Sequence, residues 1–149
     1  MIIAAILLAV FIRASQSRDV FWVLAWPGTV VHETLHYVVG FMLGAKPVEI
    51  SVIPDRAESN TIGYVNFDNL NWFNALPTAM APLLAFPLAW WAATKVPLEW
   101  SVAGCFWLWV IAAVIAQAWP SKVDFAMGTK KIVGVIFWAA VGYLLFMHG

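Results

Sequence analysis

The chain has 149 residues, of which 63% are hydrophobic and 11% are charged, and its formal net charge is zero. A soluble domain of this length would have too little polar surface to stay dissolved, so the composition indicates a membrane protein. The balanced charge argues against a nucleic-acid partner, and the single cysteine, Cys105, excludes an internal disulfide.

Apolar runs of about 20 residues predict helices that cross a bilayer, because a helix satisfies its own backbone groups within the hydrocarbon core. The opening run, MIIAAILLAVFI at 1–12, predicts a short first helix. A cleaved signal peptide is the alternative, but Arg13 follows this run, whereas a signal peptide has its positive charge before it. Four longer runs occupy residues 20–44, 72–94, 98–119 and 131–148. We therefore expect an all-α polytopic membrane protein with four to five transmembrane helices, in one domain that covers residues 1–149.

Between the first two long runs, VEISVI at 48–53 and TIGYVNF at 61–67 are rich in β-branched and aromatic residues and are separated by the turn-prone PDRAESN. This pattern predicts a β-hairpin at the membrane surface, with an irregular solvated loop as the alternative. The loops at 45–70 and 120–131 carry five of the eight Lys and Arg residues. This weak bias places the hairpin loop in the cytoplasm, and we expect an integral protein of a prokaryotic cytoplasmic membrane.

Three polar side chains interrupt the apolar run PGTVVHETLHYVVGFMLG at 27–44. His32 and His36 are four residues apart, so a helix places both on one face, where they can bind one ion. Glu33 follows the first histidine and can take a proton from a water beside that ion. A charge at the bilayer centre costs roughly 2.5–3.5 kcal/mol, which favours a functional site over a polar cluster that only joins helices. The motif predicts one Zn²⁺ ion bound by both histidines, with Glu33 as catalytic base.

A catalytic zinc needs a third protein ligand. Asp124 follows a long apolar run and a Pro-Ser break, which could fold it back toward the histidines. Ser121 and Asp124 also have the spacing of a helix capping box, so both a ligand and a cap remain open.

These residues resemble the site-2 protease family of intramembrane zinc metalloproteases. The specific match is PGTVVHETLHYVVGFMLGA at 27–45; residues 46–131 match only in the order of parts, with a hairpin, an Ala/Pro-rich helix and a later Asp. The resemblance implies a zinc endopeptidase that cuts in or near transmembrane segments of membrane proteins, with Asp124 as third ligand. The chain has Trp-Pro-Ser-Lys-Val-Asp where the family usually has an Asn-Pro-Asp-Gly type motif.

In that family the hairpin edge holds substrate as an added strand, which suits an unwound transmembrane segment. This implies substrate contacts by Tyr64, in the second strand, and by Asn71 and Asn74 after it, with ordinary turn and cap roles as the alternative for the asparagines. The expected partners are the lipid bilayer and a membrane-protein substrate. The alternative functions are a metal-binding membrane transporter and a non-catalytic scaffold that binds membrane helices.

Overall fold

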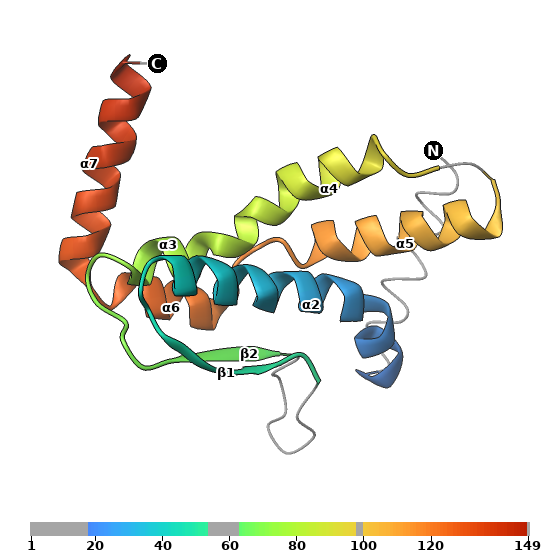
Figure 1. Ribbon diagram of the computed structural model, residues 1–149, viewed down its shortest axis with the longest axis horizontal. Helices are drawn as coiled ribbons and strands as arrows, with labels where there is room; N and C mark the ends of the chain where they lie inside the picture. Colours follow the sequence, from blue (N-terminus) through green and yellow to red (C-terminus); the bar gives the residue numbers. More distant parts are fainter. Residues whose placement is uncertain (1–17, 54–62, 98–99, 149) are drawn as a thin grey trace.

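The computed structural model describes residues 18–53, 63–97 and 100–148 (Figure 1). This part is mostly helical, with one two-stranded antiparallel sheet. The helix expected at residues 1–12 lies outside the described residues.

The motif-bearing helix, α2, runs from Arg18 to Met42. It ends in a Schellman motif, in which Gly44 adopts φ of 72°. The N–H of Ala45 donates to the carbonyl of Gly40 at 2.7 Å, and the N–H of Gly44 donates to the carbonyl of Phe41 at 3.1 Å. Glycine takes this left-handed conformation without steric penalty, so the chain turns sharply out of the helix into the hairpin.

The predicted hairpin is confirmed as strands β1, Pro47–Ser51, and β2, Tyr64–Phe67, which pair antiparallel. Figure 1 shows the hairpin running beneath α2. At the end of β2 the ring of Phe67 packs against Gly40, where a Cβ atom would overlap it. The hairpin therefore packs against α2 at Gly40, which comes after the H-E-x-x-H motif in the chain.

The apolar run at 72–94 forms one helical segment with a change of geometry in the middle. It consists of α3, Ala75–Met80, the 3₁₀ turn η1, Ala81–Leu84, and α4, Ala85–Ala93. Pro82 and Pro87 lack the N–H that a regular α-helix would use at their positions. The tighter 3₁₀ turn begins one residue before Pro82, where the α-helical pattern is interrupted.

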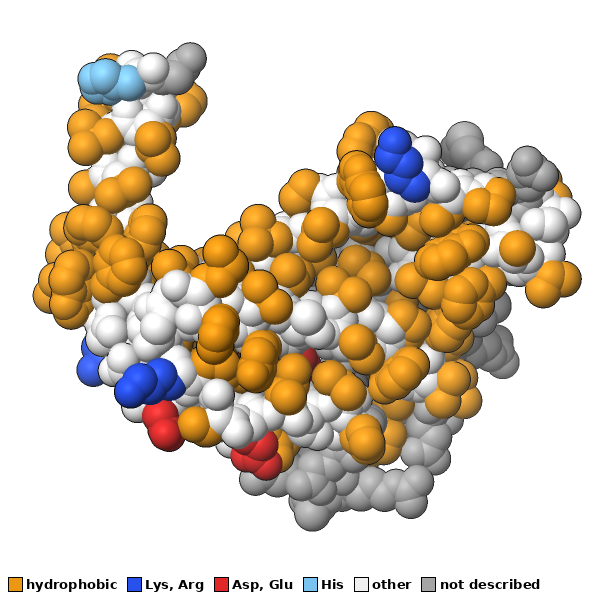
Figure 2. Space-filling view, viewed as in Figure 1, with side chains coloured by type: hydrophobic (Ala, Val, Ile, Leu, Met, Phe, Trp, Pro, Cys, Tyr) orange, Lys and Arg blue, Asp and Glu red, His pale blue; other side chains and the backbone are white. Residues whose placement is uncertain are grey.

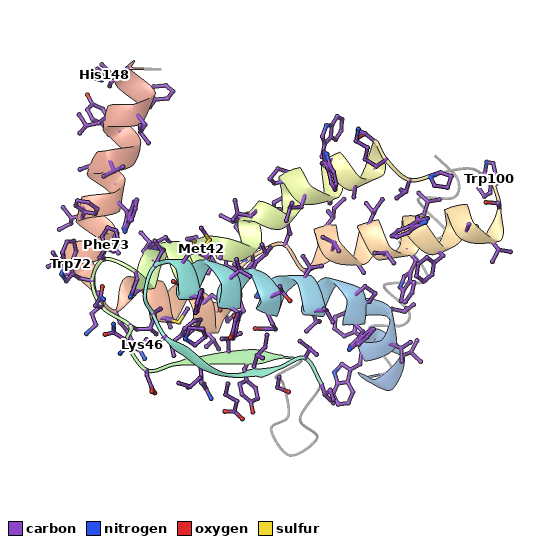
Figure 3. All side chains as sticks on the ribbon, in the orientation of Figure 1. Met42, Lys46, Trp72, Phe73, Trp100 and His148 are labelled. Carbon is purple, nitrogen blue, oxygen red and sulfur yellow. The ribbon has the colours of Figure 1, made fainter. Side chains whose placement is uncertain are left out.

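Three further helices follow in the described part of the chain, namely α5 at Val102–Ala116, α6 at Lys122–Thr129 and α7 at Ile132–His148. Helix α5 lies beside α2 (Figure 1), and the indole N–H of Trp109 donates to the carbonyl of Leu24 at 3.0 Å. The axes of α6 and α7 differ by 93°, so α7 projects away from the other helices. Figure 3 shows Trp72 and Phe73 at the base of α7 and His148 at its far end.

Small residues fill the interior of the described part, and large apolar ones lie outside. Nine of its ten buried hydrophobic residues are alanines; the exception is Val114. Large side chains such as Trp90, Phe146 and Met42 are each more than three-quarters exposed. Small side chains allow close helix packing, as at Gly28, where an added Cβ would overlap the carbonyl of Ala113 in α5.

Among the described helices, the Ala75–Ala93 segment is long and apolar enough to cross a membrane. The bent pair α6–α7 would be a second candidate if it counts as one span, and α5 is apolar but shorter. Helix α2 is not among the candidates, because its polar motif lowers its mean hydropathy. Four to five transmembrane helices therefore stay a prediction.

Two glycines of α7 provide a matched test of how this helix is attached. A Cβ at Gly134 would overlap the carbonyl of Trp72, whereas a Cβ at Gly142 would have no atom within 4 Å. We expect Gly134→Ala to lower the free energy of unfolding by about 1–3 kcal/mol through steric overlap. Gly142→Ala should raise it by up to about 1 kcal/mol through helix propensity. Thermal unfolding of both variants in detergent measures this difference, and equal midpoints would contradict the packing of α7 on Trp72.

Candidate metal centre

Two helices bring three ligand-type side chains together. His32 and His36 lie one turn apart on α2, and Asp124 comes from the first turn of α6. The Nε2 atoms of the two histidines are 3.1 Å apart. Oδ2 of Asp124 is 3.4 Å from His32 Nε2, and Oδ1 of Asp124 is 3.1 Å from His36 Nε2. All three residues are buried, and together they could hold a metal ion.

Both imidazole rings are oriented from behind by backbone carbonyls. Nδ1 of His32 lies 2.6 Å from the carbonyl oxygen of Gln117, and Nδ1 of His36 lies 2.7 Å from that of Thr78. A carbonyl oxygen only accepts, so each Nδ1 must carry the hydrogen and donate it. In the neutral ring each Nε2 is then a bare lone pair, and these lone pairs face each other and the Asp124 carboxylate.

This convergence of acceptor atoms fits a bound cation. Lone pairs and a carboxylate repel one another in a buried site unless a positive charge lies between them. Ligands around a tetrahedral zinc, with bonds of about 2.0–2.2 Å, are separated by roughly 3.3 Å. The Nε2 atoms are 3.1 Å apart, and each lies 3.1–3.4 Å from one of the two Asp124 oxygens, which is close to that value. With a single oxygen as the ligand, all three ligand atoms lie within 4.8 Å of one another. The donor set of two imidazoles and one carboxylate is also one that zinc accepts.

Asp124 caps α6 as well as facing the histidines. Its Oδ2 accepts the backbone N–H of Ser121 at 2.6 Å, and the Ser121 hydroxyl accepts the N–H of Asp124 at 3.2 Å. The capping box expected from the sequence is therefore confirmed. The same carboxylate lies within reach of both imidazoles, so the two roles that the sequence left open are compatible.

Glu33 is 7% exposed and lies beside the three candidate ligands, close enough to interact electrostatically with each. The backbone of Gly63, just before β2, covers it. A Cβ at Gly63 would lie 2.8 Å from Cγ of Glu33 and 2.9 Å from its Oε1. Within the described ranges no residue hydrogen-bonds the Glu33 carboxylate, so its oxygens are not held by a structural contact there.

The predicted substrate-binding residues lie outside this cluster. The side chain of Asn74 has no exposed surface; its Oδ1 accepts the N–H of Asn71, and its Nδ2 donates to the carbonyl of Asn69. Oδ1 of Asn71 accepts the N–H of Asn74 within the same turn. The hydroxyl of Tyr64 donates to Glu49 across the hairpin at 2.9 Å. These contacts stabilise the turn and the hairpin, and a role of these side chains in substrate binding stays a prediction.

Sequence reasoning missed the groups that support the ligands. Thr78 and Gln117 act through backbone carbonyls, which leave no side-chain signature, and Gly63 acts by having no side chain at all. Comparisons of the chain with protein-family models, with curated proteins and with solved structures found no match. The geometry of this centre is therefore the main indication of function.

Variants of the three residues separate the ligand role of Asp124 from its cap role. We expect purified wild-type protein to hold one zinc per chain, and His36→Ala to lose it because one of three ligands is gone. Asp124→Asn should also lose zinc, since a neutral amide is a poor ligand, yet its amide oxygen can still accept the Ser121 N–H. Metal content by atomic emission, measured beside thermal unfolding, provides both readouts.

Ser121→Ala is the matched control for that series. It removes the hydroxyl half of the cap, which we expect to lower stability by about 1 kcal/mol, while the zinc content stays at the wild-type level. If Asp124→Asn retained zinc as well as Ser121→Ala does, Asp124 would be a cap and not a ligand.

Proposed function

We propose that the chain is an intramembrane zinc endopeptidase of the site-2 protease type, which hydrolyses peptide bonds in or near transmembrane segments of membrane proteins. The observation that carries the proposal is the convergence of His32, His36 and Asp124, with Glu33 beside them on α2. Three protein ligands leave a tetrahedral metal one open position, as in catalytic rather than structural zinc sites.

The residues of the centre divide the chemistry between them. His32, His36 and Asp124 would hold the zinc, which when bound acidifies the attacking water and polarises the scissile carbonyl. Glu33 accepts the proton that the water loses as its oxygen bonds to the carbonyl carbon. The same carboxyl then delivers this proton to the amine nitrogen as the carbon–nitrogen bond breaks. Burial of Glu33 keeps bulk water away from these transfers.

The distribution of side chains supports a membrane setting. In Figure 2 hydrophobic side chains cover much of α4, α5 and α7, while acidic side chains gather near the hairpin. Exposed apolar surface of this extent indicates contact with a membrane or another protein. The alanine-rich interior fits lipid better than water, because helix association in lipid depends on close packing and not on burying large apolar side chains.

The hairpin is the element best placed to guide a substrate. Gly63, next to β2, packs on Glu33, and Phe67 at the other end of β2 packs on Gly40, one turn beyond His36. A substrate strand added to this two-stranded sheet would therefore run beside the motif. Strand addition would also satisfy the backbone groups that a transmembrane helix frees when it unwinds.

Glu33→Gln tests the reaction. The amide cannot accept the proton, so we expect cleavage of a model membrane substrate to fall at least about 10²-fold. Zinc content should stay at the wild-type level, because Glu33 is not a ligand in this proposal. Cleavage is measured with purified protein and substrate in the same detergent micelles or liposomes, followed by gel and mass spectrometry.

Glu33→Asp is the matched control, since it keeps the carboxylate but shortens its reach and should retain partial activity. Equal cleavage by wild type and Glu33→Gln would show that Glu33 is not the base. If neither protein cleaves but zinc crosses liposomes containing wild type, the centre belongs to a transporter.

The membrane setting is tested by extraction. We expect the chain to remain in the membrane fraction after washes with high salt and with sodium carbonate, and to be released by detergent, because its apolar surface would be in contact with lipid. His36→Ala should behave identically, since zinc is not needed for insertion. Release by carbonate alone would exclude an intramembrane peptidase.

A further inference from the structure

The carbonyl of Thr78 is available to His36 because of the residue four positions later. In a regular α-helix the carbonyl of residue 78 would accept the N–H of residue 82. Residue 82 is a buried proline and has no N–H. The Thr78 oxygen instead accepts the N–H of Ala81, and Nδ1 of His36 at 2.7 Å. A carbonyl has two lone pairs, so both are engaged, and a third donor would compete with the histidine.

The carbonyl of Gln117 is kept available to His32 in a similar way. Gln117 follows the last residue of α5, so its oxygen is one of the carbonyls that have no donor within the helix; one further helical turn would bring the N–H groups of residues 120 and 121 to it. Pro120 has no N–H. The N–H of Ser121 donates to Oδ2 of Asp124 at 2.6 Å. Nδ1 of His32 occupies the Gln117 oxygen at 2.6 Å.

We propose that Pro82 and Pro120 are positioning residues of the metal centre, each removing a backbone N–H that would compete with a histidine Nδ1 for its carbonyl. This inference rests on the metal centre of the proposed function and extends it to two residues that touch neither the metal nor the substrate. The orienting partner of a metal-bound histidine fixes its tautomer and ring angle, and its loss commonly weakens metal binding 10- to 100-fold.

The two prolines act on different ligands from different segments. Pro82 lies in η1 and affects His36, whereas Pro120 precedes α6 and affects His32. Their effects on metal affinity should therefore be separate, and the double variant should be weaker than either single one. The kinked geometry of the 75–93 segment follows from the same missing N–H, so one proline sets both the helix path and the ring of His36.

The test is the zinc affinity of the purified full chain in detergent, measured by competition with a chromophoric chelator. We expect Pro82→Ala and Pro120→Ala each to raise the zinc Kd about tenfold or more. Pro87→Ala is the matched control: it also restores an N–H in the same helical segment, but the carbonyl four residues earlier is that of Leu83, whereas the Nδ1 atoms of His32 and His36 bond the carbonyls of Gln117 and Thr78. Its Kd should equal that of wild type.

Pro82 is buried, so Pro82→Ala also leaves a void, and Pro82→Val separates the two effects. Valine restores the N–H while refilling most of the volume, so its zinc Kd should stay raised even where thermal unfolding without metal returns to the wild-type midpoint. A Kd that recovers together with the midpoint would overturn the proposal for Pro82. If Pro82→Ala does not fold, Pro120→Ala decides, and wild-type affinity in that variant overturns the proposal.

Failure of this inference and failure of the proposed function give different results. Wild type that binds no zinc contradicts the metal centre itself. Wild type that binds zinc and cleaves substrate, with proline variants of unchanged Kd, contradicts only the role of the prolines.

Discussion

The hydrogen bonds from two imidazole Nδ1 atoms to backbone carbonyls determine what the rest of the structure can do. They turn the Nε2 lone pairs of His32 and His36 toward a common point, which Asp124 reaches from α6. In the other neutral tautomer the hydrogen would be on Nε2, at that point, and a buried Nδ1 lone pair would face a carbonyl oxygen. With both rings neutral, the carbonyls therefore fix one favourable set of hydrogen positions, in which the three side chains could hold a cation.

Four chain segments must come together to form the metal centre, and small residues at their contacts let them approach closely enough. Helix α2 supplies the histidines, α3 and the end of α5 supply the carbonyls, and α6 supplies the carboxylate. Gly28 lets α5 approach α2, and Gly128 lets α6 approach Ala79 of α3, where a Cβ would lie 3.0 Å from the alanine Cβ. Each of these glycines is four residues, about one helical turn, from a ligand on its own helix. The closest helix–helix contacts at these glycines therefore lie about one turn from the candidate ligands, whose relative positions they help to fix.

The sequence predicted the candidate ligands better than the architecture. The H-E-x-x-H spacing, the hairpin and the Ser121–Asp124 cap could all be inferred, because each depends on residues close together in the chain. The Pro-Ser break before α6 indicated that Asp124 could fold back toward α2. Whether its carboxylate reaches both histidines depends on how α6 packs, which no local pattern encodes. The carbonyls of Thr78 and Gln117 could not be found from side-chain types, since every residue has one. The prolines of the 75–93 segment indicate a bent helix, but they do not by themselves place the 3₁₀ turn at Ala81–Leu84.

The shared carboxylate of Asp124 links the order of α6 to the state of the centre. The bond to the Ser121 N–H fixes the first turn of α6 and fixes the rotamer that faces the histidines. The side chain of Asp124 therefore loses much of its conformational entropy when the chain folds. Metal binding would not have to order this third ligand again. By the same linkage, a bound ion would stabilise the first turn of α6 against fraying. It would thereby also stabilise the position of α7, which follows this short helix.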